Sequence, residues 1–148
     1  MYKFWFFAIF ALLSGEAIAC SCAGYDIGES YNEYPAVFVG TVEKLETIKK
    51  RESGSWFSYY QLTQVTLKLD KVYKGSTDKK MVVTTRPGYG ACGFPFKLNQ
   101  QYAVFAYQDE KDLAVSSCGP IIHTEKREEY YEKERLTVLN FLARQNGT

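Results

Sequence analysis

The stretch Ala17-Ile18-Ala19-Cys20-Ser21-Cys22 divides the chain into two parts of different character. Before it, Met1–Lys3 is a short basic start and Phe4–Leu13 is an unbroken apolar run of ten residues. Small residues at positions 17 and 19 then meet the requirement of signal peptidase. The apolar run is too short to cross a bilayer, which takes about 20 residues. We therefore expect residues 1–19 to be a secretory signal peptide and the exported chain to begin with Cys20.

Composition limits the functions that are open to residues 20–148. The chain carries a net charge of +1, so its charge does not favour nucleic acid or an anionic membrane as a partner. Aromatic residues make up 16% of the chain and could stack on single-stranded nucleic acid, but no basic stripe accompanies them. We interpret them as core and cross-strand pairs. The expectation is one domain, a monomer, with no nucleic-acid partner and no transmembrane segment.

The cysteines are four in number, at positions 20, 22, 92 and 118. Export would place them in an oxidising compartment, extracellular or, in a bacterium, periplasmic, where disulfides form. Four cysteines allow three pairings, and the residues alone do not select one. The pair Cys20 and Cys22 could also hold a soft metal ion, but we favour disulfides. In a third interpretation the chain is a lipoprotein, because Ala17 to Cys20 loosely resembles a lipobox with alanine in the place of leucine.

After a loop-rich entry over Gly24–Pro35, five segments have the β-branched, alternating character of strands. They are Ala36–Val42 with an extension to Ile48, Tyr59–Tyr73, Met81–Thr85, Gln101–Tyr107 and Leu113–Ser117. Val72 breaks the alternation of the second segment and predicts a bulge. The polar run Lys49–Ser55 predicts a solvated hairpin tip in preference to a basic docking patch. No helices separate the strands, as a parallel sheet would require.

The C-terminal residues follow a helical pattern. Thr124 is a suitable N-cap, acidic residues follow it, and Asn146-Gly147 provides a stop. The sequence therefore predicts a helix over Thr124–Gln145. The face that we expect to pack on the barrel contains Tyr131, Leu136, Leu139 and Leu142. The predicted fold class is all-β, a five-stranded OB-fold-like barrel over residues 20–123 with a C-terminal α-helix over 124–148.

No arrangement of residues typical of catalysis is recognisable. The only histidine, His123, has no cysteine or carboxylate cluster spaced to work with it, and we expect it to be exposed at the start of the helix. Phosphate-binding, serine-hydrolase and zinc-protease motifs are missing. We therefore expect a protein that is not an enzyme and that uses no cofactor and no intrinsic metal.

Segments spread over Cys20–Ile122 resemble the inhibitory domain of the tissue inhibitors of metalloproteinases, an OB-like barrel of the netrin-like class. The matching segments are Cys20-Ser21-Cys22, Val37–Val42, Lys71–Gly75, Ala91-Cys92-Gly93 and Ser117-Cys118. The resemblance implies disulfides between Cys20 and Cys92 and between Cys22 and Cys118. The chain departs from the family in three ways. It has no cysteines for a third disulfide, a helix stands in place of the second, cysteine-rich domain of vertebrate members, and Gly24 replaces a usual proline.

The same resemblance implies a secreted inhibitor of zinc metalloendopeptidases. A catalytic zinc keeps one open coordination position, and in the family the α-amino nitrogen and carbonyl oxygen of the first cysteine, here Cys20, chelate it. Ser21 would enter the specificity pocket of the protease. The implied inhibitory ridge contains Cys20, Ser21, Cys22, Ala23, Gly90 and Ala91. The alternative is a netrin-like extracellular binding module without inhibitory activity, or a lipoprotein acylated at Cys20.

Overall fold

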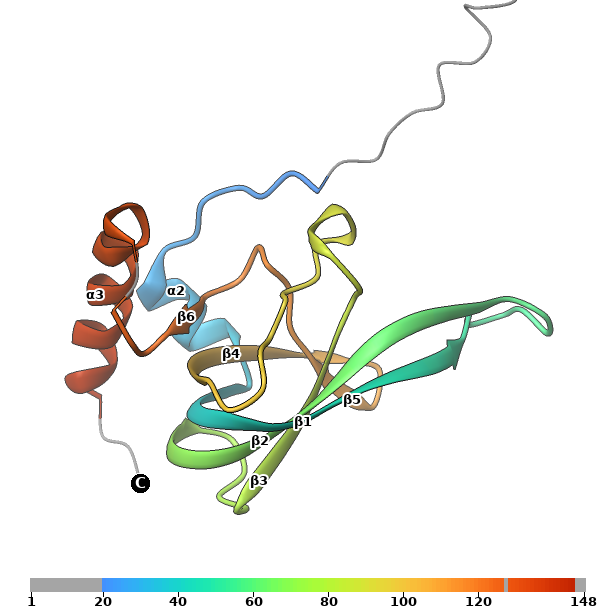
Figure 1. Ribbon diagram of the computed structural model, residues 1–148, viewed down its shortest axis with the longest axis horizontal. Coiled ribbons are helices and arrows are strands. Elements are labelled where there is room, and N and C mark those ends of the chain that lie inside the picture. Colours follow the sequence, from blue (N-terminus) through green and yellow to red (C-terminus); the bar gives the residue numbers. More distant parts are fainter. Residues whose placement is uncertain (1–19, 127, 146–148) are drawn as a thin grey trace, which may run out of the picture.

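The computed structural model describes residues 20–126 and 128–145 (Figure 1). The predicted signal peptide and the predicted helix stop at Asn146-Gly147 lie outside these residues. The elements of the described part are α2 (Ile27–Glu33), β1 (Ala36–Arg51), β2 (Tyr59–Lys74), β3 (Lys80–Thr85), the 3-10 helix η2 (Tyr89–Ala91), β4 (Gln101–Asp109), β5 (Asp112–Ala114), β6 (Ile121–His123) and α3 (Glu129–Ala143).

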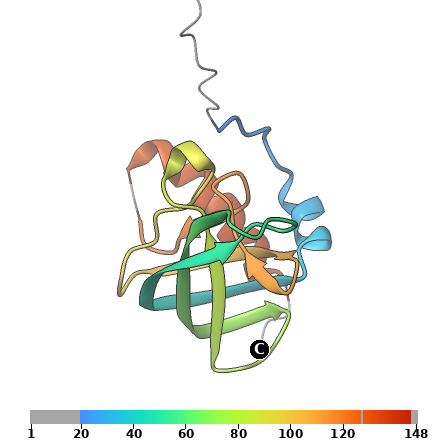
Figure 2. The same ribbon diagram turned by 90° about the vertical axis from the view of Figure 1, so that its right-hand side faces the viewer.

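Five of the strands close into a ring. Antiparallel pairing joins β1 to β2, β2 to β3, β5 to β4, and β4 back to β1. The ring is completed by a single parallel bridge, Thr84 to Ala114, between β3 and β5. Figure 2 shows the strands wrapping around a common interior. The prediction of an all-β, barrel-like fold followed by a C-terminal helix is thereby confirmed.

Strand β6, which the sequence did not reveal, adds to this ring from outside. It pairs with the first half of β4, from Tyr102 to Val104, while β5 pairs with the second half of β4, from Tyr107 to Asp109. Residues 115–120 leave the sheet between these two pairings, and they form a loop that carries Cys118. The predicted strand Leu113–Ser117 was therefore too long, because the chain turns away from β4 after Ala114.

Strands β1 and β2 form a hairpin much longer than predicted. Each has 16 residues, and three register shifts bend the ribbon. One of them lies where Val37 pairs with Lys74 and Phe38 with Val72, which confirms the bulge predicted at Val72. Pairing continues to Arg51, so the basic residues predicted to lie in a loop are strand residues. The distal half of the ribbon projects from the barrel, at the end of the molecule away from α2 and α3 (Figure 1).

The core has two parts because β4 is buried on both faces. Successive side chains of a strand point to opposite faces, so Tyr102 and Val104 enter the barrel while Ala103 and Phe105 point outward. The inner cluster fills the barrel, with Phe38 and Leu67 among its largest fully buried members. The outer cluster lies between the sheet and the helices and contains Val37, Ala103, Phe105, Ile122, Val138 and Leu142.

Helix α3 starts later than predicted. The backbone N–H of Thr124 donates to the carbonyl oxygen of Gln101 at 3.2 Å, so Thr124 extends the pairing of β6 with β4 and does not cap the helix. The helix begins after Glu128, which makes no side-chain cap, and ends at Ala143. The N-cap prediction was wrong because the hydroxyl of Thr124, which would have to cap the helix, donates instead to Gln101, with Oγ1 2.6 Å from Oε1.

The face of α3 that packs on the sheet also differs from the prediction. Val138 and Leu142 are buried and Leu139 is partly buried against the outer cluster. Leu136 and Tyr131, which were expected on the same face, are 44% and 55% exposed. The contact is made by one side of the helix only, so the apolar residues outside that stripe stay in water.

The entry segment, which was predicted to have no regular structure, contains the helix α2. Helix α2 forms there because the carboxylate of Asp26 accepts from the backbone N–H of Glu29 at 2.9 Å, as an N-cap does. An acid followed three residues later by glutamate is a recognisable start signal, and it was missed. Through Tyr31 and Tyr34 the helix covers the outer cluster next to α3.

Candidate functional site

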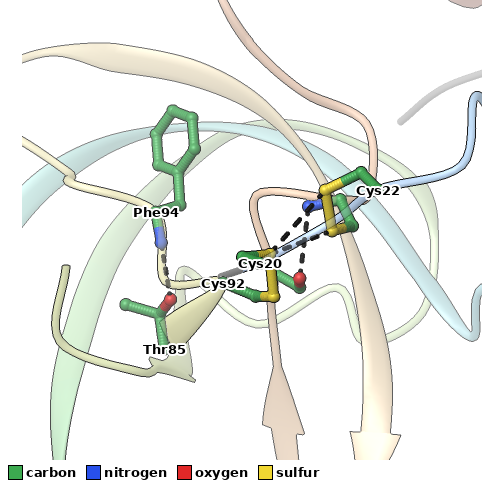
Figure 3. The surroundings of a disulfide bond; sticks show 7 residues. Cys20, Cys22, Thr85, Cys92 and Phe94 are labelled. Carbon is green, nitrogen blue, oxygen red and sulfur yellow. Dashed lines mark hydrogen bonds between the residues drawn. A yellow bond between two sulfur atoms is a disulfide. The ribbon is translucent and has the colours of Figure 1, made fainter. Parts of the chain in front are cut away.

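Two disulfides hold the start of the described chain on the barrel. Residues 20–23 have no regular secondary structure. Cys20 is bonded to Cys92, with Cα atoms 5.2 Å apart, and Cys22 to Cys118, with Cα atoms 5.1 Å apart. These are the pairs that the resemblance implied. Figure 3 shows the two bonds next to each other. A segment without hydrogen-bonded structure of its own is thus fixed by covalent bonds to two distant loops.

The four sulfur atoms form one compact group. The Sγ atom of Cys20 lies 3.5 Å from that of Cys118 and 3.9 Å from that of Cys22. Every cysteine is in a disulfide, so these are packing contacts without a thiol hydrogen. The sulfurs of Cys20, Cys92 and Cys118 lie within 4.8 Å of one another, but a soft metal is held by thiolates, and the disulfides leave none. The two disulfides, which we call the staple, therefore hold Cys20 and Cys22 on the barrel.

The conformation of the loop that carries Cys92 depends on Gly93. Cys92 adopts a left-handed conformation, with φ of 59°, and the N–H of Gly93 then donates to the carbonyl oxygen of Gly88 at 3.0 Å. A Cβ atom on Gly93 would lie 1.7 Å from the carbonyl oxygen of Arg86, so no other residue fits. The next N–H, of Phe94, donates to Thr85 Oγ1 at 2.9 Å (Figure 3).

The two loops that receive the disulfides are also joined to each other. The N–H of Ser117 donates to the carbonyl oxygen of Cys92 at 2.9 Å. Within the second loop, the N–H of Cys118 donates to Ser116 Oγ at 3.2 Å. Because Cys92 and Cys118 belong to one hydrogen-bonded unit, Cys20 and Cys22 are fastened to a common support and not to two independently moving loops.

The predicted ridge residues come together at the surface. Ser21, Cys22 and Ala23 are exposed, whereas Cys20 is half-buried. Gly90 and Ala91, on η2, are exposed as well, and the disulfide from Cys20 to the neighbouring Cys92 holds the two segments together. Cys20, Ser21, Gly90 and Ala91 all line one surface depression of about 630 Å³. Cys22 and Ala23 lie outside this depression.

The rest of that depression was not predicted, and we call it the groove. Its walls come from β2, β3 and the β4–β5 hairpin, and include Tyr60, Leu62, Arg86, Tyr107 and Asp109. The guanidinium carbon of Arg86 lies 5.8 Å from the ring centre of Tyr60, within cation–π range. Burial, followed by the nearby charge of Asp109, raises the pKa of Tyr107, while Arg86 opposes the shift. The groove is therefore a mixed aromatic and charged surface.

Just after the ridge, Tyr25 connects the N-terminal segment to α3. Its hydroxyl donates to the carboxylate of Glu134. Burial, together with this hydrogen bond, raises the pKa of Tyr25 well above its usual range. The tyrosine therefore stays protonated in neutral solution and keeps donating. This contact is a noncovalent restraint on the ridge in addition to the disulfides.

His123 is not exposed at the start of the helix, as was predicted. It is half-buried on β6, with its ring centre 4.4 Å from that of Tyr102 and 6.3 Å from that of Phe94. The prediction failed because β6 was not recognised, and pairing with β4 draws the imidazole against the aromatic group.

Comparison with known proteins assigns no family to this chain. No family model matches it, and no curated protein matches it. Within residues 20–126 and 128–145, no helix is both long enough and apolar enough to span a membrane.

Proposed function

We propose that the exported chain is an inhibitor of zinc metalloendopeptidases that chelates the protease zinc through the α-amino nitrogen and carbonyl oxygen of Cys20. The observation that supports this most directly is the double staple. Cys20 is held half-buried by its own disulfide, and Ser21 beside it is exposed next to Gly90 and Ala91. A terminus fixed in this way loses little conformational entropy when it binds, which favours affinity.

The chemistry of the partner fits such a terminus. A catalytic zinc has three protein ligands and one position open to water. An amine and a carbonyl oxygen on the same residue can displace that water and chelate the zinc together, which makes the zinc five-coordinate. The sulfur is not needed because it is in the disulfide. Ser21 would then point into the protease, where its side chain would select among targets. The chain supplies no cofactor and no intrinsic metal in this proposal, and it is not an enzyme.

We further assign the barrel to the OB type. The order β1-β2-β3-β5-β4, closing on β1 with only β3 and β5 parallel, supports this assignment, since the OB-fold is a five-stranded Greek-key barrel. The two disulfides support secretion, because disulfides persist in oxidising compartments. We propose a monomer that binds no nucleic acid.

One observation favours a second candidate, a binding module without inhibitory activity. Chelation by Cys20 does not require the groove, yet the groove borders the ridge and offers Tyr60, Tyr107 and Arg86 to a partner. A lipoprotein is less well supported, because a thioether-linked lipid and the disulfide to Cys92 cannot share the sulfur of Cys20.

The test compares the native chain beginning at Cys20 with a variant extended by one alanine before it, against a panel of zinc endopeptidases. The extension displaces the amine from the metal but leaves both disulfides in place. We expect the native chain to inhibit at least one protease and the extended chain to lose inhibition. Ser21→Gly should change which proteases are inhibited while leaving the thermal stability unchanged.

The pH dependence of inhibition gives an independent check. An α-amino group has a pKa of about 7.7–8.0, and its proton must leave before the nitrogen can bind zinc. Inhibition should weaken as pH falls below that range, after correction for the protease's own titration. If the native chain inhibits no protease, or the extended chain inhibits equally well, chelation is wrong and the binding module takes its place.

A further inference from the structure

The tip of the β1–β2 hairpin exposes two large apolar side chains. Trp56 is 81% exposed and Phe57 is 93% exposed, and they are neighbours in the turn beyond the last pair of the ladder, Arg51 with Tyr59. Such rings gain free energy when they are removed from water. The polar run Lys49–Ser55, which ends just before them, predicted a solvated tip. The structure instead places the most exposed aromatic pair of the described residues at the point farthest from the barrel.

The loop that presents these rings is ordered by its own hydrogen bonds. The N–H of Glu52 donates to the carbonyl oxygen of Ser58 at 2.9 Å, and the N–H of Ser55 to the carbonyl oxygen of Glu52 at 3.1 Å. The N–H of Ser58 donates to Ser55 Oγ at 2.9 Å. The backbone of the tip is therefore partly satisfied without water, and residues 53–58 contain no charged side chain.

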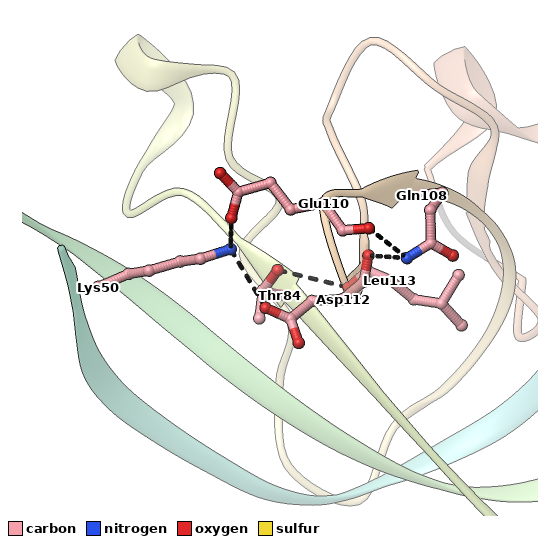
Figure 4. A network of polar contacts seen from close by, with 6 residues as sticks. All are labelled: Lys50, Thr84, Gln108, Glu110, Asp112 and Leu113. Atoms are coloured by element: carbon pink, nitrogen blue, oxygen red, sulfur yellow. Dashed lines mark hydrogen bonds and ion pairs between the residues drawn. The ribbon is translucent and has the colours of Figure 1, made fainter. Parts of the chain in front are cut away.

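Behind the uncharged tip, one acidic residue, Glu52, is followed by three basic residues. Lys49 and Arg51 are exposed, and alternation along the strand places them on one face of the ribbon. Lys50, on the other face, binds the β4–β5 turn, with Nζ 3.1 Å from a carboxylate oxygen of Glu110 and 3.2 Å from one of Asp112 (Figure 4). This contact joins the ribbon to the β4–β5 turn one pair before the ladder ends at Arg51 and Tyr59, so only residues 52–58 lie beyond it.

We propose that the hairpin tip docks on the surface of a lipid bilayer, with Trp56 and Phe57 in the interfacial region and Lys49 and Arg51 at the level of the lipid phosphates. Tryptophan is the residue type most enriched at this boundary, and long basic side chains reach from it toward the head groups. This docking is peripheral, it involves no spanning segment, and it does not depend on the proposed inhibitory function.

Two features favour a bilayer over a pocket in a partner protein. The tip is a narrow, convex end of a two-stranded ribbon, and lipid can surround it on every side, whereas a protein would need a matching cavity. Along the ribbon, the apolar rings and the uncharged serines and glycine come before the charged residues Glu52, Arg51 and Lys49, and this order follows the change in polarity from the interface to the aqueous phase. Burying residues 53–58 desolvates no ion, so the cost is small.

Trp56 is a built-in reporter for the test. The other tryptophan, Trp5, belongs to the predicted signal peptide, so the exported chain contains Trp56 alone. The exported protein is titrated with phosphatidylcholine vesicles, with and without phosphatidylserine, at low and high salt. On binding, we expect the fluorescence emission of Trp56 to shift to shorter wavelength, and we expect nitroxide-labelled lipids to quench this fluorescence. Binding should persist in phosphatidylcholine alone and at high salt, with phosphatidylserine strengthening it at low salt.

Variants separate the tip from other exposed aromatic residues. Trp56→Ala and Phe57→Ala should each lower the partition coefficient, measured by vesicle co-sedimentation, about tenfold. The matched control is the pair Tyr130→Ala and Tyr131→Ala on α3, whose side chains are 85% and 55% exposed, and it should bind as the native chain does. Far-ultraviolet circular dichroism checks that every variant is folded.

Three results would overturn the proposal. The first is absence of vesicle binding by the folded native protein. The second is binding that survives removal of both Trp56 and Phe57. The third is binding that requires phosphatidylserine and disappears in high salt, which would indicate a purely electrostatic contact through Lys49 and Arg51. A protein partner captured by the tip in place of lipid would accompany the first result and would count against the bilayer.

Discussion

The ridge at Cys20 and the tip of the β1–β2 hairpin are both exposed, but they are held in opposite ways. The N-terminal part of the ridge, residues 20–23, has no regular secondary structure and is fixed by disulfides that span 72 and 96 residues of sequence. The outer part of the hairpin is held by a regular ladder between the two strands, which runs from the pair Lys44 and Thr66 to the pair Arg51 and Tyr59 at its end. One is positioned by remote parts of the chain, and the other by the strand beside it.

This difference in support predicts a difference in motion. A two-stranded ribbon that extends beyond its sheet is only marginally stable by itself, so the tip can bend while its ladder stays intact. The ridge cannot move without the loops at Cys92 and Cys118, which are hydrogen-bonded to each other. We therefore expect the ridge to be preorganised and the hairpin tip to be adaptable.

The largest effect should come from removing the staple. Each disulfide closes a loop long enough to contribute about 4 kcal/mol in the chain-entropy treatment, as an upper value. Typical domains are stable by about 5–15 kcal/mol, so reducing both bonds should unfold the barrel near body temperature. Thermal unfolding with and without reductant measures this. A melting temperature that barely changes on full reduction would mean that the barrel holds the ridge without its disulfides.

A smaller loss is expected when the outer cluster is weakened. Leu142 is buried between α3 and the sheet, so Leu142→Ala should destabilise the protein by about 2–5 kcal/mol. The control, Leu136→Ala, removes the same atoms from an exposed position and should change stability by less than about 0.5 kcal/mol. Denaturant unfolding compares the two, and similar losses would contradict the helix face described above. Hydrogen exchange near Tyr25 should rise in Leu142→Ala, since Tyr25 binds α3 through Glu134.

The ridge can also be disturbed without touching a cysteine. Gly93→Ala would force a Cβ against the carbonyl oxygen of Arg86, and we expect a loss of roughly 3 kcal/mol, at the upper end of overpacking costs. Gly90→Ala is the matched control, because no atom lies within 4 Å of the added Cβ. It should leave stability unchanged, as judged by denaturant midpoints. Equal destabilisation by both would show that the loop is sensitive to any added side chain.

A structural feature could be predicted from the sequence when neighbouring residues alone determine it, and was missed when distant parts of the chain determine it. Alternation in Tyr59–Tyr73 and the break at Val72 predicted β2 and its bulge, since both are properties of neighbouring residues. The ridge segments were named in advance through the resemblance and its cysteine spacing. In contrast, β6 has only three residues, and Ile121–His123 becomes a strand only because β4 offers an edge.

The groove and the helix face were missed for the same physical reason. Tyr60, Arg86 and Tyr107 come from three strands, and only closure of the ring brings them to one depression. Thr124 looked like an N-cap, but both its N–H and its hydroxyl bond to Gln101 at the edge of the sheet. The tip could have been noticed, because Trp56 and Phe57 stand directly after a polar run that already indicated a turn.

The smallest effect on stability, and the sharpest contrast between the two ends, should follow from Lys50→Ala. Hydrogen bonds to Glu110 and Asp112 raise the pKa of Lys50. The ammonium therefore stays charged through neutral pH, and its restraint is lost only as pH rises above the usual lysine value of about 10.4. Removing an exposed ion pair should leave the melting temperature almost unchanged, yet free the ribbon from the β4–β5 turn. Amide exchange should then accelerate between Arg51 and Tyr60 while the loop at Cys92 stays protected.

Lys49→Ala, on the opposite face of the ribbon, is the control and should leave exchange as it is. If exchange at Cys92 rises together with the tip in Lys50→Ala, the two ends are coupled and the division between a rigid ridge and an adaptable hairpin is wrong.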